Sequence, residues 1–326
     1  MALKLGIIGY GGMATGWHQP NCEKVSGIEV VAAYDINPER VALAESKGLT
    51  GYHTLNEFLA DERVNTVLVA TPNDFHCEMV CAALNAGKNA ISEKPVTLSV
   101  ELLDKMIEAS KKAGKIFTVH HNRRWDTDFV RAKSVFESGK LGNVYAIKSQ
   151  GSGTHGAMYG WRSEPEHGGG MLYDWGIHFL DQIYYMLGYD ELLSVKCSLK
   201  SVRTPLVDDY FSMMITTRGG INVVVENGTF ILEKPPRWTI MGDMGTLRID
   251  DYEGNGEIIL AVDKQGNKTC EPVPELKPQW AEFYENLRDA LDGKAELAVQ
   301  PWQVRKVLHL VECAFESAAT GKQIEL

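Results

Sequence analysis

The chain has 326 residues, of which 44% are hydrophobic and 23% charged, and its formal net charge is −10. This length is enough for two domains with sizeable cores, and the negative charge argues against nucleic acid or an anionic membrane as the main partner. No apolar run approaches the roughly 20 residues that span a bilayer, and no signal-peptide pattern precedes the first strand, so we expect a cytoplasmic protein. The six scattered cysteines contain no C-x-x-C pair, which predicts free thiols.

A glycine-rich turn follows the first predicted strand, at residues 4–8, and opens a helix predicted over 12–24. Gly9 permits the tight turn, Gly11 lets the backbone approach a pyrophosphate, and Ala14 lets the helix lie close to the strand. The N–H groups at the helix start then attract phosphates. The other residues of this predicted cofactor loop are Tyr10, Gly12 and Met13. A tight turn without a ligand is the alternative interpretation.

The second predicted strand, at residues 28–34, ends on Asp35. This acid lies at about the 20-residue spacing typical of the carboxylate that binds the adenosine ribose. Asp35 would accept hydrogen bonds from the ribose hydroxyls and repel a 2′-phosphate, and Ile36 follows it where an arginine would hold that phosphate. The pattern therefore favours NAD over NADP. Arg40 is the one feature against this, and a solvated helix residue is its simpler interpretation.

Strands and helices alternate as far as about residue 120, which predicts a parallel sheet with helices on both faces. The further strands are expected at 66–71, 88–92 and 116–119, and the further helices at 38–48, 54–60, 76–86 and 99–113. We assign residues 1–122 to a Rossmann-type NAD-binding domain. Ligands of such sheets bind outside the carboxyl ends of the strands.

The pattern changes after residue 122, and we assign residues 123–326 to a second α/β domain for substrate binding, catalysis and oligomerisation. Strand-like runs lie at 143–152, 192–203, 208–217, 220–231, 237–242, 245–250 and 256–262, and helices are expected at 127–138, 170–187, 278–292 and 301–318. Turn signals between the runs predict a large, open and mostly antiparallel sheet. An open sheet face with apolar alternation needs covering, so we expect a homodimer or homotetramer.

Lys94 stands directly after a predicted buried strand, between Glu93 and Pro95. Pro95 stiffens the turn because it cannot extend the strand ladder. A lysine at this edge can donate to a substrate hydroxyl, and its pKa shifts readily when it is partly buried. A surface lysine in a loop is the alternative.

Three glycines, Gly168 to Gly170, precede a helix on which Asp174 and His178 stand at i and i+4. A carboxylate on the same face orients an imidazole and stabilises its charged form, which suits a general base acting on an alcohol. Asp181, at i+3 from His178, is the alternative partner. The other interpretations are a surface pair or a buried histidine that is only hydrogen-bonded. His178 and Asp181 could also be two metal ligands, but no further spaced ligand completes a site, so we expect no metal.

Taken together, these motifs resemble the glucose–fructose oxidoreductase / inositol dehydrogenase / rhizopine-catabolism family, Gfo/Idh/MocA. The matching elements are Gly9-Tyr-Gly-Gly-Met-Ala14, Tyr34-Asp35, Ala70-Thr-Pro-Asn73 with His76, Glu93-Lys94-Pro95, and Gly168-Gly-Gly-Met-Leu-Tyr-Asp174-Trp-Gly-Ile-His178. The resemblance implies a Rossmann domain, an open-faced α/β domain, and an active site between them that oxidises or reduces a sugar, cyclitol or related polyol with NAD(P). It also implies that Lys94 and His178 hold the catalytic positions, with Asp174 beside them.

The resemblance further implies cofactor contacts on the nicotinamide side and a substrate pocket. The implied cofactor residues are Thr71, Pro72, Asn73, His76, Glu93, Lys94 and Asn122. The substrate candidates are Arg123, His155, Trp161, Arg162 and Tyr173, with Arg124, Trp125 and Tyr159 as further candidates. A packed domain interface explains any one of these substrate candidates equally well. His120 and His121, at a strand end, are similarly ambiguous.

Two other functions remain open at this point. One is an NAD-dependent glycosidase or C-glycoside-processing enzyme that oxidises its substrate transiently, because oxidation beside a carbon acidifies its proton and allows elimination. The other is a non-catalytic NAD-binding regulatory protein. Against the regulator stands the presence of Lys94, Asp174 and His178 together, since a sensor needs no base, orienting acid and cation.

Overall fold

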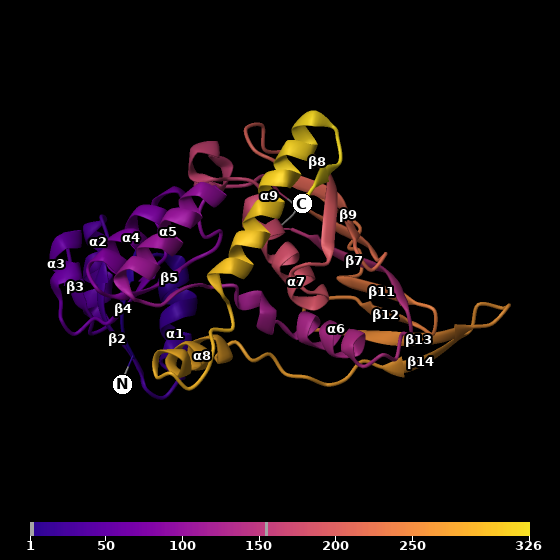
Figure 1. Cartoon of the computed structure of the whole chain (residues 1–326), viewed down its shortest axis with the longest axis horizontal. Helices are drawn as coiled ribbons and strands as arrows, with labels where there is room; N and C mark the ends of the chain where they lie inside the picture. Colours follow the sequence, from indigo (N-terminus) through magenta and orange to yellow (C-terminus); the bar gives the residue numbers. More distant parts are fainter. Residues whose placement is uncertain (1–2, 154–155) are drawn as a thin grey trace. The chain divides into compact units, whose positions relative to one another are not determined.

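The computed structural model describes residues 3–153 and 156–326. Contacts divide the chain into two compact units, coloured along the sequence in Figure 1. The first unit runs to His121 and also includes Trp280–Arg305, and the second consists of Asn122–Gln279 and Lys306–Leu326. The helix α9 (Pro301–Thr320) therefore begins in the first unit and continues in the second.

The first unit is built on a six-stranded sheet with the order β3-β2-β1-β4-β5-β6, in which every pair is parallel. Its strands are β1 (Leu3–Ile8), β2 (Ile28–Tyr34), β3 (Thr50–Tyr52), β4 (Thr66–Val69), β5 (Asn89–Ser92) and β6 (Phe117–Val119). All four residues of β4 are buried, as expected for a strand covered on both faces. The strand order reverses between β1 and β4, which is where doubly wound sheets bind dinucleotides. The predicted Rossmann fold is confirmed.

Helices and short turns connect these strands. They are the π-helical turn η1 (Ala14–His18), α1 (Gln19–Cys22), α2 (Pro38–Ser46), α3 (Leu55–Ala60), the 3₁₀ turn η2 (Asn73–Phe75), α4 (His76–Asn85) and α5 (Val100–Ala113). The same unit also contains α8 (Glu282–Leu291), which follows β14 in the chain. Side chains of Asn37, Thr54 and Ser99 cap α2, α3 and α5 by accepting backbone N–H bonds. In place of the regular helix predicted over 12–24, the structure has the π-turn η1 followed by the short helix α1.

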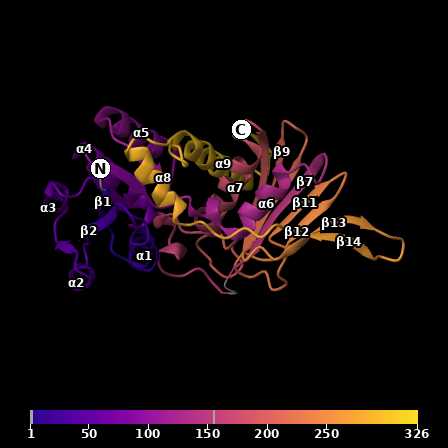
Figure 2. The ribbon, with the colours of Figure 1, turned by 90° about the horizontal axis from the view of Figure 1, so that it is seen from below.

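The second unit contains a nine-stranded sheet with the order β14-β13-β12-β11-β7-β10-β9-β8-β15. Its strands are β7 (Val144–Ser152), β8 (Leu192–Lys200), β9 (Tyr210–Thr217), β10 (Asn222–Gly228), β11 (Trp238–Gly242), β12 (Thr246–Ile249), β13 (Gly256–Val262), β14 (Lys268–Pro272) and β15 (Ile324–Glu325). The pair β7–β10 is parallel and the other pairs are antiparallel, so the mostly antiparallel sheet is confirmed. The sequence had not predicted β14 and β15, and β13 and β14 form the hairpin at one edge of the sheet (Figures 1 and 2).

One face of this sheet is buried. Residues along β9 alternate between buried and less buried positions, which is the pattern of a sheet covered on one side. The core includes Phe179 and Ile183 of α7 (Ile177–Leu187) and Phe211 of β9. The other helical segments of this unit are η3 (Asn122–Trp125), α6 (Thr127–Glu137), η4 (Gly160–Ser163), η5 (Pro165–His167) and the π-helical turn η6 (Leu172–Gly176).

Two further predictions concern the chain as a whole. Within residues 3–153 and 156–326, no helix combines the length and the hydropathy needed to cross a bilayer. All six cysteines lie in this described part and are free thiols, as predicted.

Candidate active site

The glycine turn after β1 has the shape that a dinucleotide needs. Gly9 has a φ of 88°, and a Cβ at this position would lie 2.7 Å from the carbonyl oxygen of Ala70, so only glycine fits. At Gly11 and Gly12, in contrast, a Cβ would meet no atom within 4 Å. The backbone of the turn therefore borders open space at the two positions where a pyrophosphate approaches. The residues of the glycine turn therefore fit a dinucleotide cofactor.

Asp35 follows β2, and its carboxylate is hydrogen-bonded to the backbone of the glycine turn. Its Oδ2 accepts a hydrogen bond from the backbone N–H of Tyr10 at 2.8 Å, and its Oδ1 accepts one from the N–H of Asn37 at 2.9 Å. A carboxylate has about four acceptor positions, so both oxygens retain capacity for ribose hydroxyls. The next residue, Ile36, is 87% exposed.

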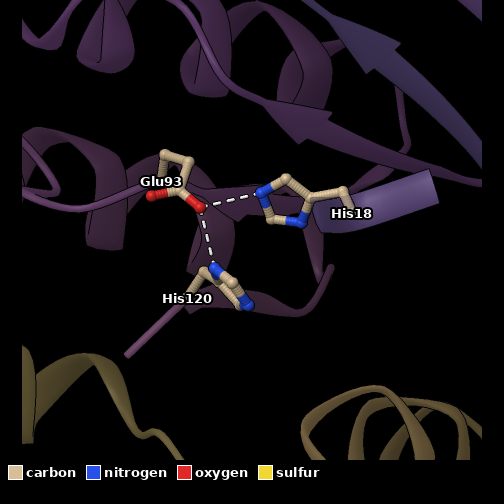
Figure 3. Close-up of side chains that lie close together, drawn as sticks. All are labelled: His18, Glu93 and His120. Atoms are coloured by element: carbon tan, nitrogen blue, oxygen red, sulfur yellow. Dashed lines mark hydrogen bonds and ion pairs between the residues drawn. The ribbon is translucent and has the colours of Figure 1, made fainter. Parts of the chain in front are cut away.

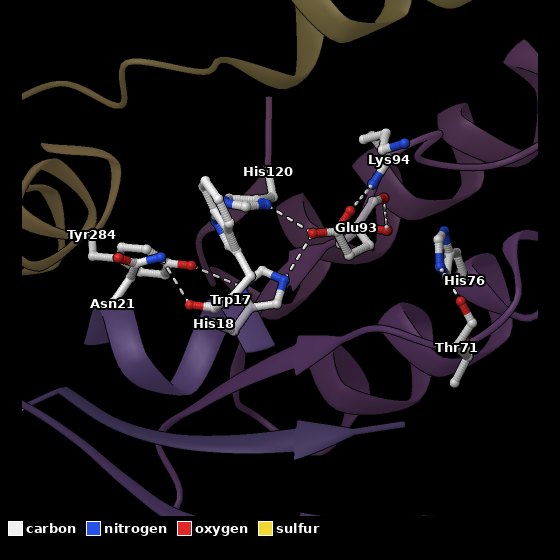
Figure 4. Close-up of polar contacts among 10 residues, drawn as sticks. Trp17, His18, Asn21, Thr71, His76, Glu93, Lys94, His120 and Tyr284 are labelled. Carbon is white, nitrogen blue, oxygen red and sulfur yellow. Dashed lines mark hydrogen bonds and ion pairs between the residues drawn. The ribbon is translucent and has the colours of Figure 1, made fainter. Parts of the chain in front are cut away.

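His76 lies beside Thr71 of the loop after β4 (Figure 4) and also contacts the turn after β5. Its Nδ1 lies 2.8 Å from the carbonyl oxygen of Pro95, and its Nε2 lies 2.9 Å from that of Thr71. Burial lowers the pKa of His76, and the two carbonyl contacts oppose this effect. Asn73, which begins η2, is also buried. The predicted cofactor residues of these two loops are thus held together at the carboxyl edge of the sheet.

Glu93, directly after β5, lies at the centre of a buried hydrogen-bond network (Figure 3). Its Oε1 lies 2.7 Å from Nε2 of His18 and 2.7 Å from Nδ1 of His120, and its Oε2 accepts the backbone N–H of Lys94 at 3.0 Å. On the far side of His18, Nδ1 lies 2.8 Å from the hydroxyl of Tyr284. Burial alone raises the pKa of Glu93, but His120 and His18 more than reverse this and hold its pKa well below the usual value. Glu93 is therefore an ionised, buried acid.

Lys94, two residues after β5, follows at the same edge and is partly buried. Sequence reasoning did not identify His18 or Tyr284, and it left His120 undecided. Nothing in a local motif links these residues to Glu93, because the hydrogen bonds span 75 residues to His18 and 27 to His120. The position of His18 on the helix after the glycine turn was the one available signal.

In the second unit, Asp174 and His178 lie on either side of the junction between η6 and α7. Both are buried, with 8% and 4% of their surfaces exposed. Oδ2 of Asp174 accepts a hydrogen bond from Nε of Arg162 at 3.0 Å. The four-residue separation between Asp174 and His178 therefore includes part of a π-turn. Such turns are frequent at functional sites, and the sequence did not reveal this one.

Asp208 holds the start of this helix and was also missed. Its Oδ2 accepts the N–H of Leu172 at 2.8 Å, and its backbone oxygen accepts that of Met171 at 2.8 Å. Gly170 has a φ of 111° and a side chain there would collide with the Asp208 carboxylate, so glycine is required. Burial raises the pKa of Asp208 to about 6.

The predicted substrate residues make several contacts within the second unit. The guanidinium of Arg123 stacks 4.3 Å from the ring of Trp175 and binds Asp126 at 2.6 Å, while that of Arg162 lies 4.3 Å from the ring of Trp161. Tyr173 packs against the ring of Phe315, and burial raises its pKa to about 12. Asn122 begins η3, and His155 lies outside the described residues.

Arg124 and Asp181 form a buried, bidentate ion pair. Nε of Arg124 donates to Oδ2 of Asp181 at 2.8 Å, and its Nη2 donates to Oδ1 at 2.6 Å. Asp181 is therefore bound to Arg124, and Asp174 stays the proposed partner of His178. A bidentate pair of this kind fixes the geometry of both side chains.

Comparisons with known proteins agree with this architecture. Residues 3–121 match the oxidoreductase family's NAD-binding Rossmann fold, and residues 133–326 match the same family's C-terminal alpha/beta domain. The crystal structure of an NAD-binding protein from Listeria innocua is 37% identical, with a TM-score of 0.91 over 100% of this chain and 97% of that chain. An inositol 2-dehydrogenase of Salmonella paratyphi B is 32% identical over 69% of this chain and 67% of the relative.

A third relative, the scyllo-inositol 2-dehydrogenase (NADP(+)) IolW of Bacillus subtilis, is 24% identical over 99% of this chain and 96% of its own length. The two family matches cover nearly the whole chain, and the residues of the glycine turn fit the nicotinamide cofactor that the Rossmann domain implies. The chain therefore belongs to the Gfo/Idh/MocA family of oxidoreductases, with the family's NAD-binding Rossmann domain followed by its C-terminal α/β domain.

Proposed function

We propose that this oxidoreductase is an NAD-dependent dehydrogenase that acts on a secondary alcohol of a sugar, cyclitol or related polyol. The observation that carries the proposal is the pair of buried polar residues, Asp174 and His178, on either side of the junction between η6 and α7 in an oxidoreductase with an NAD-binding domain. Two relatives named as inositol 2-dehydrogenases support the choice of a polyol.

Each residue has a distinct role in the proposal. His178 takes the hydroxyl proton as general base, and Asp174 stabilises the imidazolium that forms. Arg162, bound to Asp174 at 3.0 Å, fixes that carboxylate. Lys94 donates a hydrogen bond to the reacting oxygen and lowers its pKa. When bound, NAD supplies the acceptor for the hydride that leaves the same carbon.

The preference for NAD over NADP is part of the proposal and depends on Asp35. Its carboxylate stands at the end of β2, where it repels a 2′-phosphate, and the exposed neighbour Ile36 offers no compensating charge. A relative that is named for NADP makes this choice worth testing. Replacing Asp35 by Ser together with Ile36 by Arg should shift the ratio of kcat/KM values toward NADP, because it removes a repelling charge and adds a phosphate partner. A wild type that already prefers NADP would contradict the role given to Asp35.

A cytoplasmic location and self-association complete the proposal. The free state of all six cysteines supports a reducing compartment. The outward side of β9 carries Met214, whose surface is 54% exposed, and a second copy of the chain would cover such a face as a homodimer or homotetramer.

The proposal is tested by a dehydrogenase assay over a panel of sugars and inositols, with NAD and NADP in parallel. We expect reduction of NAD by at least one polyol. Tight NAD binding without turnover on any polyol would favour a regulatory protein. Release of an aglycone without net NADH would favour transient oxidation by a glycosidase.

A further inference from the structure

The network around Glu93 has a defined arrangement of protons. An ionised carboxylate only accepts hydrogen bonds, so Nε2 of His18 and Nδ1 of His120 must both donate to it. Burial lowers the pKa of His18, which favours its neutral ring, and the Tyr284 hydroxyl then donates to Nδ1 of His18. Two imidazole N–H groups and one backbone N–H thus hold the charge of Glu93 in place (Figures 3 and 4).

A metal ion is the competing explanation, since these two histidines and Glu93 offer ligand atoms within 4.8 Å of one another. Ligands at 2.0–2.1 Å from a tetrahedral zinc are separated by about 3.3 Å. Both nitrogens lie closer to the Glu93 oxygen than this, at 2.7 Å, which is a normal N–H···O length. The spacing therefore favours protons as the bridging particles.

The network joins parts of the first unit that are far apart in the sequence. His18 ends the π-turn after the glycine loop, Glu93 follows β5, His120 follows β6, and Tyr284 lies on α8. The network reaches the candidate chemistry through Oε2 of Glu93, which accepts the N–H of Lys94 at 3.0 Å.

We propose that His18 and His120 are positioning residues for Lys94 and act through Glu93; this inference rests on the catalytic role given to Lys94 above. Loss of either imidazole leaves a buried carboxylate with one donor fewer, so Glu93 turns toward another donor or takes up a proton. In both cases its hydrogen bond to the Lys94 backbone is weakened. A displacement of about 1 Å at a reacting group costs on the order of 10²-fold in rate.

The first test compares truncating with conservative variants. His18→Ala and His120→Ala should lower kcat by roughly 10- to 100-fold, with little change in the KM for the alcohol. His18→Gln places an amide nitrogen near the position of Nε2, and His120→Asn places one near that of Nδ1. These two variants should recover most of the lost kcat. Conservative variants as impaired as the alanine variants would overturn the inference.

A double-mutant cycle separates positioning from a general structural role. In a Lys94→Ala background, His18→Ala should cause no further loss of kcat, because the residue through which it acts is already gone. Additive losses would overturn the inference. A Lys94→Ala enzyme with normal kcat would instead overturn the proposed role of Lys94, and the readout without turnover described below then decides the inference alone.

Lys88 supplies a matched control at the opposite end of β5. Its buried Nζ donates to the backbone oxygens of Asp61 at 2.9 Å and Val64 at 2.7 Å. Lys88→Met removes two buried hydrogen bonds, as a substitution in the network does, but far along the strand from Lys94. It should lower the melting temperature and leave kcat unchanged. Equal losses of kcat in Lys88→Met and His18→Ala would contradict positioning.

Amide hydrogen exchange tests the inference without any substrate. If Glu93 holds the N–H of Lys94, both histidine-to-alanine variants should exchange this amide at least about tenfold faster than wild type, whereas Lys88→Met should not. An unchanged rate in both variants would overturn the inference. Mass spectrometry of the purified protein gives a second check. One equivalent of a transition metal in wild type that is missing from either histidine-to-alanine variant would also overturn the inference.

Discussion

Two buried carboxyl groups, one in each unit, have pKa values that are shifted in opposite directions. Burial raises the pKa of both Glu93 and Asp208. Glu93 has two imidazole partners as well as a backbone N–H, and its pKa ends well below the usual value. The Asp208 carboxylate binds the backbone N–H of Leu172, and its pKa is raised to about 6. The partners of a carboxylate, and not its burial alone, therefore decide the direction in which its pKa is shifted.

The proposed catalytic residues of the two units differ in a similar way. In the first unit, histidines serve a carboxylate and hold it ionised beside Lys94. In the second unit, the carboxylate of Asp174 is bound to Arg162, and the histidine of the same helix, His178, is the residue to which we assign proton transfer. The network around Glu93 holds a negative charge, whereas Asp174 and His178 are proposed to transfer a proton.

The largest expected effect comes from removing the proposed general base, His178. His178→Ala should lower kcat/KM by roughly 10² to 10⁴-fold, the usual contribution of a positioned acid–base group. For the wild type, kcat/KM for alcohol oxidation should rise with pH as the imidazole loses its proton, and the variant should lack this limb. The measurement is the pH–rate profile of both proteins. A residual activity that keeps the wild-type limb would identify another base, and Tyr173 is a poor candidate because its pKa is raised to about 12.

A smaller effect is expected from removing the charge of Glu93. Glu93→Gln should lower the free energy of unfolding by about 3 kcal/mol at pH 7, because the amide cannot accept from both imidazoles and the Lys94 N–H at once. Since the pKa of Glu93 is lowered in the folded state, its stabilisation is present above its ordinary value of 4.5 and is lost as pH falls further. Denaturant titrations between pH 3 and 7 should therefore show a steeper acid loss for wild type than for the variant. Parallel curves would contradict the ionised state of Glu93.

The smallest effect, and of opposite sign, is expected at Asp208. Its pKa in the folded state, about 6, lies above its ordinary 3.8, so the stability it contributes is present below about pH 4 and is lost as pH rises to about 6. Asp208→Asn keeps an acceptor for Leu172 and removes the buried charge, so it should raise the free energy of unfolding at pH 7 by about 1–2 kcal/mol. The gain should vanish at pH 4. A loss of stability at pH 7 would show that the charged acceptor is required.

The sequence predicted the parts of the molecule that local pattern determines. Buried apolar strands such as β4, the glycine turn at Gly9, and the acid at Asp35 each leave a signal within a few residues. The site residues placed by resemblance, among them Lys94 and His178, also stand in such motifs.

The rest depended on contacts that no local pattern encodes. The bonds from Glu93 to His18 and His120 form only when strands and helices assemble, and the capping of η6 by Asp208 joins residues 36 apart. The two π-turns, Ala14–His18 and Leu172–Gly176, were expected as ordinary helix because both contain helix-compatible residues. The short edge strand β15 is stabilised by its pairing with β8 and carries too little periodicity to predict.

The central claim, direct hydride transfer from a ring alcohol to NAD, is tested most directly with a polyol deuterated at its carbinol carbons. After incubation with the enzyme and NAD, mass spectrometry of the reduced cofactor should show one deuterium per molecule, and the rate should fall relative to the unlabelled polyol. Reduced cofactor without deuterium, or no reduced cofactor with any polyol of the panel, would contradict the account.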